Sequence, residues 1–166
     1  MLERFYPDKE VLSAYKIDYE KLYTQGYRGI IFDIDNTLVP HGAPADKQAV
    51  RLFKRLHAIG YQTVLLSNNK EPRVKPFGDQ VMSQYIYKAG KPGKAGYEKA
   101  MELLGTDKGT TIFVGDQLFT DVWGAKKAGI RTYLVKPIHP KEEIQIVLKR
   151  YLEKIVLYFY YRKMKK

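Results

Sequence analysis

The strongest constraint on the fold is a regular alternation between short, apolar, β-branched runs and longer segments with helical periodicity. The predicted strands are residues 29–34, 61–66, 84–88, 110–114 and 131–135. The predicted helices cover 44–58, 71–81, 93–104, 119–128 and 141–161. Strands that alternate with helices form a parallel sheet with helices on both faces. The expected fold class is therefore α/β, with a central parallel sheet of five strands.

Length, cysteine content and charge limit the kinds of protein this can be. With 166 residues the chain fits one domain, which we predict over 1–166 with its sheet core at 28–136. The absence of cysteine excludes disulfides, thiolate metal sites and a cysteine nucleophile. No signal peptide and no membrane-spanning run is recognised, so we expect a cytoplasmic protein. The formal charge of +11 favours anionic partners.

Polar side chains follow four of the predicted strands at the point where each strand ends. In chain order they are Asp33, Asp35 and Thr37, then Ser67, Asn68 and Asn69, then Lys91, and finally Asp116 and Asp121. Ligands of open α/β sheets bind beyond the carboxyl ends of the strands, so we expect these groups at one edge. Residues i and i+2 of a strand point to the same side, so Asp33 and Asp35 can address one site.

This combination of groups has the chemistry that phosphoryl transfer needs. An aspartate can attack phosphorus and form an aspartyl phosphate, which water later cleaves. A carboxylate repels a phosphate dianion unless a divalent cation is bound between them, and Mg²⁺ prefers a site built from oxygen ligands. A lysine and a hydroxyl can hold the transferring group, and a second carboxylate can move protons.

Four segments resemble the motifs of the haloacid dehalogenase (HAD) superfamily, in the expected order. They are IFDIDNTL, VLLSNN, KAGKPGK and VGDQLFTD, and the resemblance covers residues 28–135. It implies a phosphatase with a capless, Rossmann-like three-layer sandwich and the strand order 5-4-1-2-3.

The resemblance also implies roles for individual residues, with Mg²⁺ as cofactor. Asp33 would be the nucleophile and a metal ligand. Asp35 would be the general acid and base, with its backbone carbonyl on the metal. The other roles would be phosphate binding by Ser67, Asn68 and Lys91, and metal binding by Asp116 and, directly or through water, by Asp121.

The N-terminal segment RFYPDKEVLSAYKIDYEKLYTQGYRGIIFDIDNTLV is similar to HAD subfamily IIIA. That subfamily is related to the HAD-type phosphatidylglycerophosphate phosphatases, which implies a lipid phosphate as substrate and a place in phospholipid metabolism. No room for a cap exists between the first two strands or before Lys91. An open site suits a phosphate carried on something large.

The predicted C-terminal helix combines apolar and basic residues. Its apolar residues recur at helical spacing and are Ile144, Val147, Leu148, Tyr151, Leu152, Ile155, Tyr158 and Phe159. The residues expected on its other side are Lys149, Arg150, Glu153 and Lys154. Packing on the sheet or on a second subunit and contact with the inner face of an acidic membrane are both compatible with this pattern.

Several of these residues also have a simpler explanation that involves no function. Lys91 could be a solvated lysine, Ser67 a turn residue and Asp121 a helix cap. Asn36 and Thr37 are expected to shape the turn, and the histidines to lie at the surface. Two other functions stay open: a phosphatase for sugar phosphates, nucleotides or nucleic acid ends, and a non-enzymatic module that binds RNA or membrane. Nucleic acid is not the favoured partner.

Overall fold

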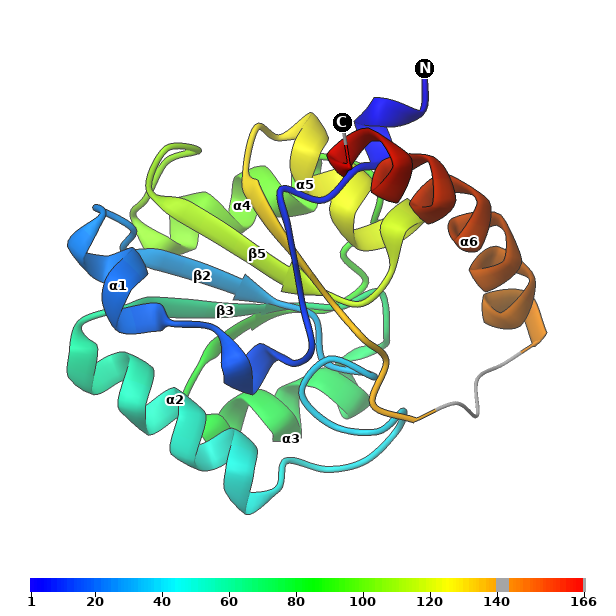
Figure 1. The fold of residues 1–166 in the computed structure, drawn as a ribbon. Helices are drawn as coiled ribbons and strands as arrows, with labels where there is room; N and C mark the ends of the chain where they lie inside the picture. Colours follow the sequence, from blue (N-terminus) through cyan, green and yellow to red (C-terminus); the bar gives the residue numbers. More distant parts are fainter. Residues whose placement is uncertain (140–143, 166) are drawn as a thin grey trace.

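The computed structural model of the protein describes residues 1–139 and 144–165. One parallel sheet has the order β1-β6-β5-β2-β3-β4 (Figure 1). Its strands are β1 (Lys9–Val11), β2 (Gly29–Phe32), β3 (Gln62–Leu66), β4 (Gln84–Ile86), β5 (Thr111–Gly115) and β6 (Arg131–Val135). The α/β class and the order of the five predicted strands are confirmed, and β2 is central as expected.

The predicted number of five strands is wrong, because β1 adds a sixth at the edge beside β6. β1 has only three residues, and none of them is fully buried, so it has no strong apolar pattern. Its position depends on contacts distant in sequence. The Asp8 carboxylate accepts hydrogen bonds from the backbone N–H and the hydroxyl of Thr132, at 2.8 and 3.0 Å.

Helices cover both faces of the sheet, as the alternating side chains of β2 require. Ile30 and Phe32 face a layer formed by α1 (Tyr19–Thr24), α2 (Lys47–Ile59) and α3 (Glu71–Val81). Ile31 faces the opposite layer, which contains α4 (Ala95–Leu104) and α5 (Trp123–Lys127) (Figure 1). The carboxyl ends of the strands lie between these layers and stay accessible at one edge.

The predicted helix over 119–128 begins as a π-helical turn, η3 (Leu118–Val122), which continues into α5. Such turns are frequent at functional sites, and this one carries Asp121. Only Asp116 and Gln117 separate the end of β5 from the start of η3, so Asp116 and Asp121 lie close together along the chain.

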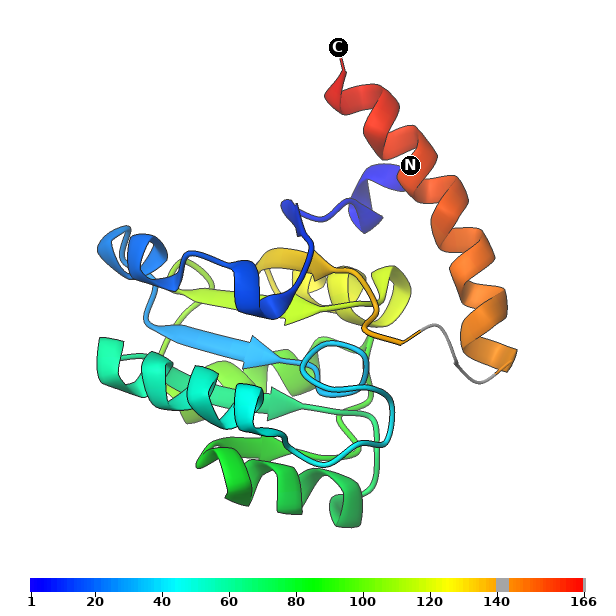
Figure 2. The ribbon, with the colours of Figure 1, turned by 60° about the horizontal axis from the view of Figure 1, so that its bottom comes forward.

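The C-terminal helix α6 (Ile144–Met164) stands beside the layers and packs on the N-terminal turn η1 (Leu2–Phe5) and on η3 (Figure 2). Residues 141–143 of the predicted helix lie outside the described part of the chain. Within the described residues, no helix has the length and hydrophobicity needed to cross a membrane.

Candidate active site

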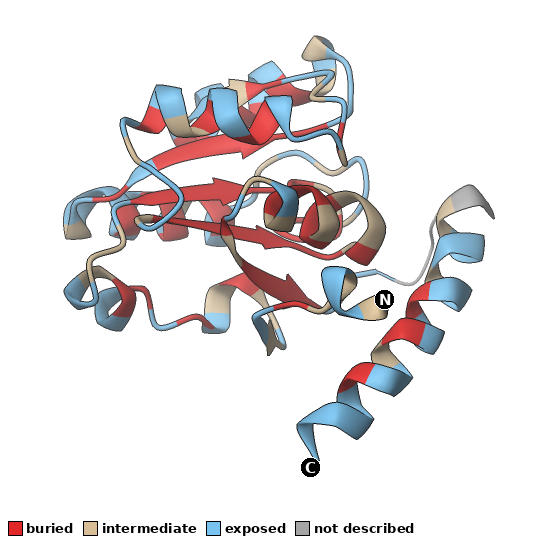
Figure 3. Cartoon of the chain, turned by 90° about the horizontal axis from the view of Figure 1, so that it is seen from above, coloured by how far each residue is buried: buried red, intermediate tan, exposed pale blue. Residues whose placement is uncertain are grey.

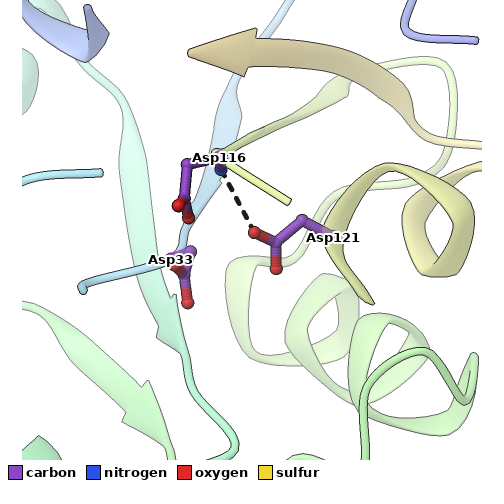
Figure 4. Close-up of side chains that lie close together, drawn as sticks. All are labelled: Asp33, Asp116 and Asp121. Atoms are coloured by element: carbon purple, nitrogen blue, oxygen red, sulfur yellow. Dashed lines mark hydrogen bonds between the residues drawn. The ribbon is translucent and has the colours of Figure 1, made fainter. Parts of the chain in front are cut away.

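Three buried carboxylates meet at the carboxyl edge of the sheet (Figure 4). Asp33 directly follows β2, Asp116 directly follows β5, and Asp121 lies in η3. One oxygen from each lies within 4.8 Å of the others. The central position of β2 and its neighbour β5 in the sheet brings these residues together, as the sequence predicted.

Lys91 neutralises part of this cluster. Its Nζ lies 2.8 Å from Oδ1 of Asp33 and 2.7 Å from Oδ1 of Asp121. Lys91 is itself buried, which rules out the alternative that it is an ordinary solvated lysine. Lys91 therefore links Asp33, the expected nucleophile, to Asp121.

Asp121 is held by the backbone that surrounds it. Its Oδ2 accepts hydrogen bonds from the N–H groups of Asp116 and Gln117, at 3.2 and 3.1 Å. A Cβ on Gly115 would lie 2.6 Å from this oxygen, so only glycine leaves room for the carboxylate there. The other oxygen, Oδ1, is thereby directed to Lys91 and the cluster.

Asp116 is contacted from two sides. The hydroxyl of Thr37 donates to its Oδ1 at 3.2 Å, and also lies 3.4 Å from Oδ2 of Asp33. On the other side Arg150 of α6 forms an ion pair with Oδ2 at 2.5 Å and donates to the backbone oxygen of Asp116 at 2.6 Å. Arg150 also pairs with Glu153 at 3.0 Å.

Asp35 is a neighbour of the acidic cluster but has different partners. Its carboxylate accepts from the backbone N–H of Gly42 at 2.7 Å and from the side-chain amide of Asn69 at 2.6 Å. It also pairs with Arg73 at 2.9 Å. These contacts fix Asp35 at the rim of the site, in a place distinct from the cluster around Asp33. The expected contact of its backbone carbonyl with a metal stays a prediction.

Ser67 and Asn68 line the same cleft as Asp33 and Lys91. Both polar atoms of the Asn68 side chain bind the backbone of Lys91. Its Oδ1 accepts a hydrogen bond from the Lys91 N–H at 2.8 Å, and its Nδ2 donates one to the Lys91 carbonyl at 3.0 Å. The Ser67 hydroxyl accepts a hydrogen bond from the N–H of Asn69 at 3.1 Å, as expected for a turn residue. Its proton remains available to a ligand.

The charges of the cluster are poorly compensated by the protein alone. Burial and the nearby charge of Asp121 raise the pKa of Asp33 to about 6. Burial and the charges of Asp33 and Asp121 raise the pKa of Asp116 well above its usual range, although Arg150 opposes this. Burial alone would lower the pKa of Lys91, but Asp121 and Asp33 outweigh it and raise that pKa.

These observations fit a divalent cation. The cluster offers carboxylate oxygens only, from three buried residues, which suits Mg²⁺ or a similar hard cation. A cation would relieve the repulsion that raises the pKa values of Asp33 and Asp116. Asp33, Asp116 and Asp121 are therefore able to hold one, and the choice between direct and water-mediated contact for Asp121 stays open.

A cleft of about 200 Å³ gives access to the cluster. Its walls carry the predicted site residues Asp33, Asp35, Ser67, Asn68 and Lys91, together with His41, Asn69, Gln117, Thr120, Ile146 and Lys149. The last two belong to α6. The helix therefore forms part of the entrance to the cleft.

From Val147 onward, the apolar residues that the sequence predicted for one face of α6 are exposed, and most of the helix is coloured as exposed in Figure 3. Their exposed fractions range from 38% for Val147 to 64% for Leu148 and Tyr151, and Ile155 is 55% exposed. The face that packs on the protein carries Val156, Tyr160 and the buried Glu153. Of the alternatives that the sequence left open, packing of this face on the sheet does not agree with the exposure of its described residues. Contact with a second subunit or with a membrane stays a prediction.

The profile of the haloacid dehalogenase-like hydrolases matches residues 45–129. The chain belongs to this family. It is 35% identical over 159 residues to a Bacillus subtilis protein named "Probable phosphatase YqeG", with 95% of this chain and 92% of that protein covered. The family match makes this chain a HAD-like hydrolase, and the similarity to the Bacillus subtilis protein supports a phosphatase.

Two further similarities are more distant. Phosphatidylglycerophosphate phosphatase 1 of Arabidopsis thaliana is 27% identical over 168 residues, which cover 89% of this chain and 48% of that protein. The cobalt-bound form of a deoxy-D-mannose-octulosonate 8-phosphate phosphatase from Haemophilus influenzae superposes with a TM-score of 0.52 at 14% identity. The superposition covers 70% of this chain and 81% of that one, and it shows the shared HAD fold.

Two site residues escaped the sequence analysis. Thr37 was expected to shape the turn, yet its hydroxyl lies between Asp33 and Asp116. Arg150 was placed on the polar side of the C-terminal helix without a role. The signal available for Arg150 is its spacing of three residues from Glu153, which allows an ion pair on one helix face. The partner 34 positions away, Asp116, has no local signal.

Proposed function

We propose that this HAD-family phosphatase is a Mg²⁺-dependent phosphomonoester hydrolase that forms a covalent phosphoryl group on Asp33. The observation that carries the proposal is the position of the Asp33 carboxylate. It lies in the wall of the cleft, bonded to Lys91 and within a cluster of three acidic residues. Such a carboxylate can reach a phosphoryl group while Lys91 offsets the charge of the phosphoryl oxygens.

The chemical steps follow from the residues around the cleft. An oxygen of Asp33 forms a bond to phosphorus as the bond between phosphorus and the ester oxygen breaks, and Asp35 gives its proton to the departing alkoxide. Water then attacks the same phosphorus and Asp35 accepts a proton from it. Inorganic phosphate leaves and the Asp33 carboxylate is restored. Ser67 and Lys91 would bind the phosphoryl oxygens, and Asn68 holds the backbone of Lys91.

The oxygens of Asp33, Asp116 and Asp121 would hold the cation, with the backbone carbonyl of Asp35. When bound, Mg²⁺ supplies positive charge that allows a carboxylate and a phosphate dianion to approach each other. Thr37 donates to Asp116 and lies near Asp33, which keeps the two carboxylates apart at a fixed distance.

Replacement of Asp33 and of Asp35 tests this assignment. Asp33→Asn should abolish hydrolysis of an aryl phosphate at saturating Mg²⁺, because the amide is a poor nucleophile. Asp35→Asn should keep phosphorylation of Asp33 with an activated aryl leaving group, yet slow the hydrolysis of the phosphoenzyme, which intact-protein mass spectrometry detects. Turnover by Asp33→Asn at the wild-type rate would exclude the covalent role.

We further propose a lipid phosphate such as phosphatidylglycerophosphate as the substrate. The similarity to a plant phosphatidylglycerophosphate phosphatase supports it. The exposed face of α6 supports it independently, because it is apolar, large and adjacent to the cleft through Ile146 and Lys149.

The proposed occupant of that face is an acidic membrane surface at the cytoplasmic side. Basic residues accompany the apolar face along α6 and at its end: Lys149, Lys154, Arg162, Lys163 and Lys165. Apolar contact and attraction to anionic lipid are the two signals that together give stable peripheral binding. A second copy of the chain would be favoured by the apolar residues but repelled by the shared positive charge.

Vesicle binding separates these occupants. The wild-type chain should sediment with vesicles rich in phosphatidylglycerol and much less with phosphatidylcholine vesicles. Leu152→Ser with Ile155→Ser should reduce sedimentation, while Leu12→Ser with Met82→Ser removes two even more exposed apolar groups elsewhere and should not. Dimerisation that the first pair abolishes, without vesicle binding by the wild type, would assign the face to a homo-oligomer instead.

The substrate needs its own experiment. A Mg²⁺-dependent screen should give the highest kcat/KM for a lipid phosphate presented in vesicles. Preference for a sugar phosphate, a nucleotide or a nucleic acid end would replace the lipid assignment and leave the phosphatase mechanism intact. RNA or membrane binding without turnover of any phosphate would favour the non-enzymatic module.

A further inference from the structure

Arg150 connects α6 to the acidic cluster through one residue. Its two terminal nitrogens contact Oδ2 and the backbone oxygen of Asp116, at 2.5 and 2.6 Å. The other carboxylate oxygen of Asp116, Oδ1, receives the hydroxyl of Thr37. The two oxygens of Asp116 are therefore divided: one faces α6 and the other faces Asp33.

The contacts of Arg150 are themselves supported. The Glu153 carboxylate pairs with Arg150 at 3.0 Å through Oε2 and accepts from the N–H of Leu118 at 2.9 Å through Oε1. Leu118 is the first residue of η3, the turn that carries Asp121. Glu153 is buried, so this bridge from α6 to η3 is shielded from solvent.

We propose that Arg150 is a positioning residue for the divalent-cation site. By holding Oδ2 and the backbone oxygen, the planar guanidinium fixes the orientation of the Asp116 carboxylate and leaves Oδ1 for a cation shared with Asp33 and Asp121. Partners that orient a ligand carboxylate in this way commonly contribute ten- to hundredfold in metal affinity. The inference rests on the proposed use of the cluster as a cation site.

A competing role for Arg150 makes the opposite prediction. If the guanidinium stood in for the cation, removing it would tighten metal binding. The geometry favours positioning, because the contacts of Arg150 fall on Oδ2 and the backbone oxygen, whereas Lys91 is the cation that contacts both Asp33 and Asp121. The sign of the change in metal affinity therefore decides between the two roles.

Calorimetric titration of the full chain with Mg²⁺ measures that sign without any substrate. Arg150→Gln should bind Mg²⁺ ten- to hundredfold more weakly than the wild type. Arg150→Lys should lie between them, since an ammonium cannot make both contacts in one plane. Lys154→Gln is the matched control: it removes the same charge from α6 one turn away, at an exposed side chain that does not line the cleft, and should show no weakening.

Arg150→Gln leaves Glu153 buried without its ion-pair partner, which could destabilise the fold. Arg150→Gln combined with Glu153→Gln removes the unpaired charge of Glu153 and should recover part of the melting temperature that Arg150→Gln loses in the absence of Mg²⁺. It should still bind Mg²⁺ weakly, because Asp116 has lost its ion-pair partner in both variants. In Arg150→Ala, millimolar guanidinium chloride should recover Mg²⁺ affinity, while sodium chloride at equal ionic strength should not.

The outcomes are distinct from those of the proposed function. Equal or tighter Mg²⁺ binding by Arg150→Gln, in a wild type that binds Mg²⁺, overturns the positioning role and leaves the phosphatase mechanism standing. Recovery of full affinity in the folded double variant also overturns it, since the loss would then have come from an unpaired Glu153. A wild type that binds no divalent cation overturns both proposals.

Discussion

The edge of the sheet and α6 both contribute to the cleft, but they are built on opposite principles. At the edge, the carboxylates of Asp33, Asp116 and Asp121 are buried. Each forms an ion pair, with Lys91 for Asp33 and Asp121 and with Arg150 for Asp116. On α6, the face that packs on the protein combines the buried Glu153 with Val156 and Tyr160, and a mostly apolar face is exposed. In the first region, charged side chains of a kind usually found at the surface are buried. In the second, apolar side chains of a kind usually found in a core are exposed.

The difference indicates what each region is for. Buried charges cost free energy of folding unless they are paired, so a cluster of them is retained for chemistry rather than for stability. A large exposed apolar face is equally unfavourable for an isolated protein and is typical of an interaction surface. The chain therefore has a reactive edge and a contact helix, joined by the pair of Arg150 and Asp116.

The largest expected effect comes from removing the ammonium at the edge. Lys91→Met should lower kcat for an aryl phosphate by about a hundred- to thousandfold, because no other cation contacts both Asp33 and Asp121 among the described residues. Without Mg²⁺ it should also lower the free energy of unfolding by about 3 kcal/mol or more, measured by urea titration, since two carboxylates lose their partner.

Lys94→Met provides the comparison for this change. Lys94 is an exposed lysine three positions later, paired with Glu98 at 3.4 Å. Its replacement should leave both kcat and the free energy of unfolding close to wild type. If Lys91→Met behaved in the same way, the edge would not depend on its charge pairs and the contrast with α6 would be lost.

The raised pKa of Asp33, about 6, predicts a pH dependence of stability. The ordinary value in an unfolded chain is near 4, so the folded state binds this proton more tightly. Without a divalent cation, the contribution of Asp33 to the free energy of unfolding should fall as pH rises from about 4 to about 6 and stay low above that. The change is on the order of 2 kcal/mol.

Asp33→Asn isolates this contribution. Because asparagine does not titrate, the variant should lack that part of the slope, and the stability difference between variant and wild type should grow with pH over this window. Saturating Mg²⁺ should reduce the slope of the wild type. Parallel profiles for the two proteins without a divalent cation would contradict the unfavourable charge at Asp33.

Two adjacent residues test the two faces of α6. Val156 is 4% exposed and Ile155 is 55% exposed. Val156→Ala should cost about 1–2 kcal/mol in the free energy of unfolding, whereas Ile155→Ala should change it by less than about 0.5 kcal/mol. Chemical denaturation measures both. The reverse order would mean that the helix packs on the protein through the face that the sequence pattern predicted.

The smallest expected effect concerns Lys149 at the cleft entrance. Because it is exposed, its attraction for a second negative charge on a substrate is screened. Lys149→Gln should lower the ratio of kcat/KM for 3-phosphoglycerate over glycerol 3-phosphate by about two- to fivefold, and added salt should weaken the wild-type preference. Lys154→Gln, which does not line this cleft, should leave the ratio unchanged.

Much of the fold could be predicted because its signals are local. Continuous apolar runs mark the strands, and the residues that follow them are brought to one edge by the parallel arrangement alone. Asp33, Asp116, Asp121 and Lys91 could therefore be placed together from sequence. Their roles in binding and catalysis stay predictions, to be decided by the experiments above.

The elements that escaped prediction depend on contacts between distant parts of the chain. β1 is three residues long, and it pairs with β6, more than a hundred positions away. The orientation of α6 contradicts its own pattern, because Val156 and Glu153 find partners on η1 and η3 and Tyr160 packs on Tyr6, while the longer apolar stripe is exposed. Arg150 could not be recognised before that orientation was known.

Gly115 has a consequence for how the positions of this chain can vary. A side chain there would meet the Asp121 carboxylate at 2.6 Å and the Phe113 ring at 2.7 Å, so glycine is required by space and not by its backbone angles. Positions 115 and 121 are therefore expected to covary. A homologue with a larger residue at 115 should have lost or moved the carboxylate at 121, and its acidic cluster would contain two members instead of three.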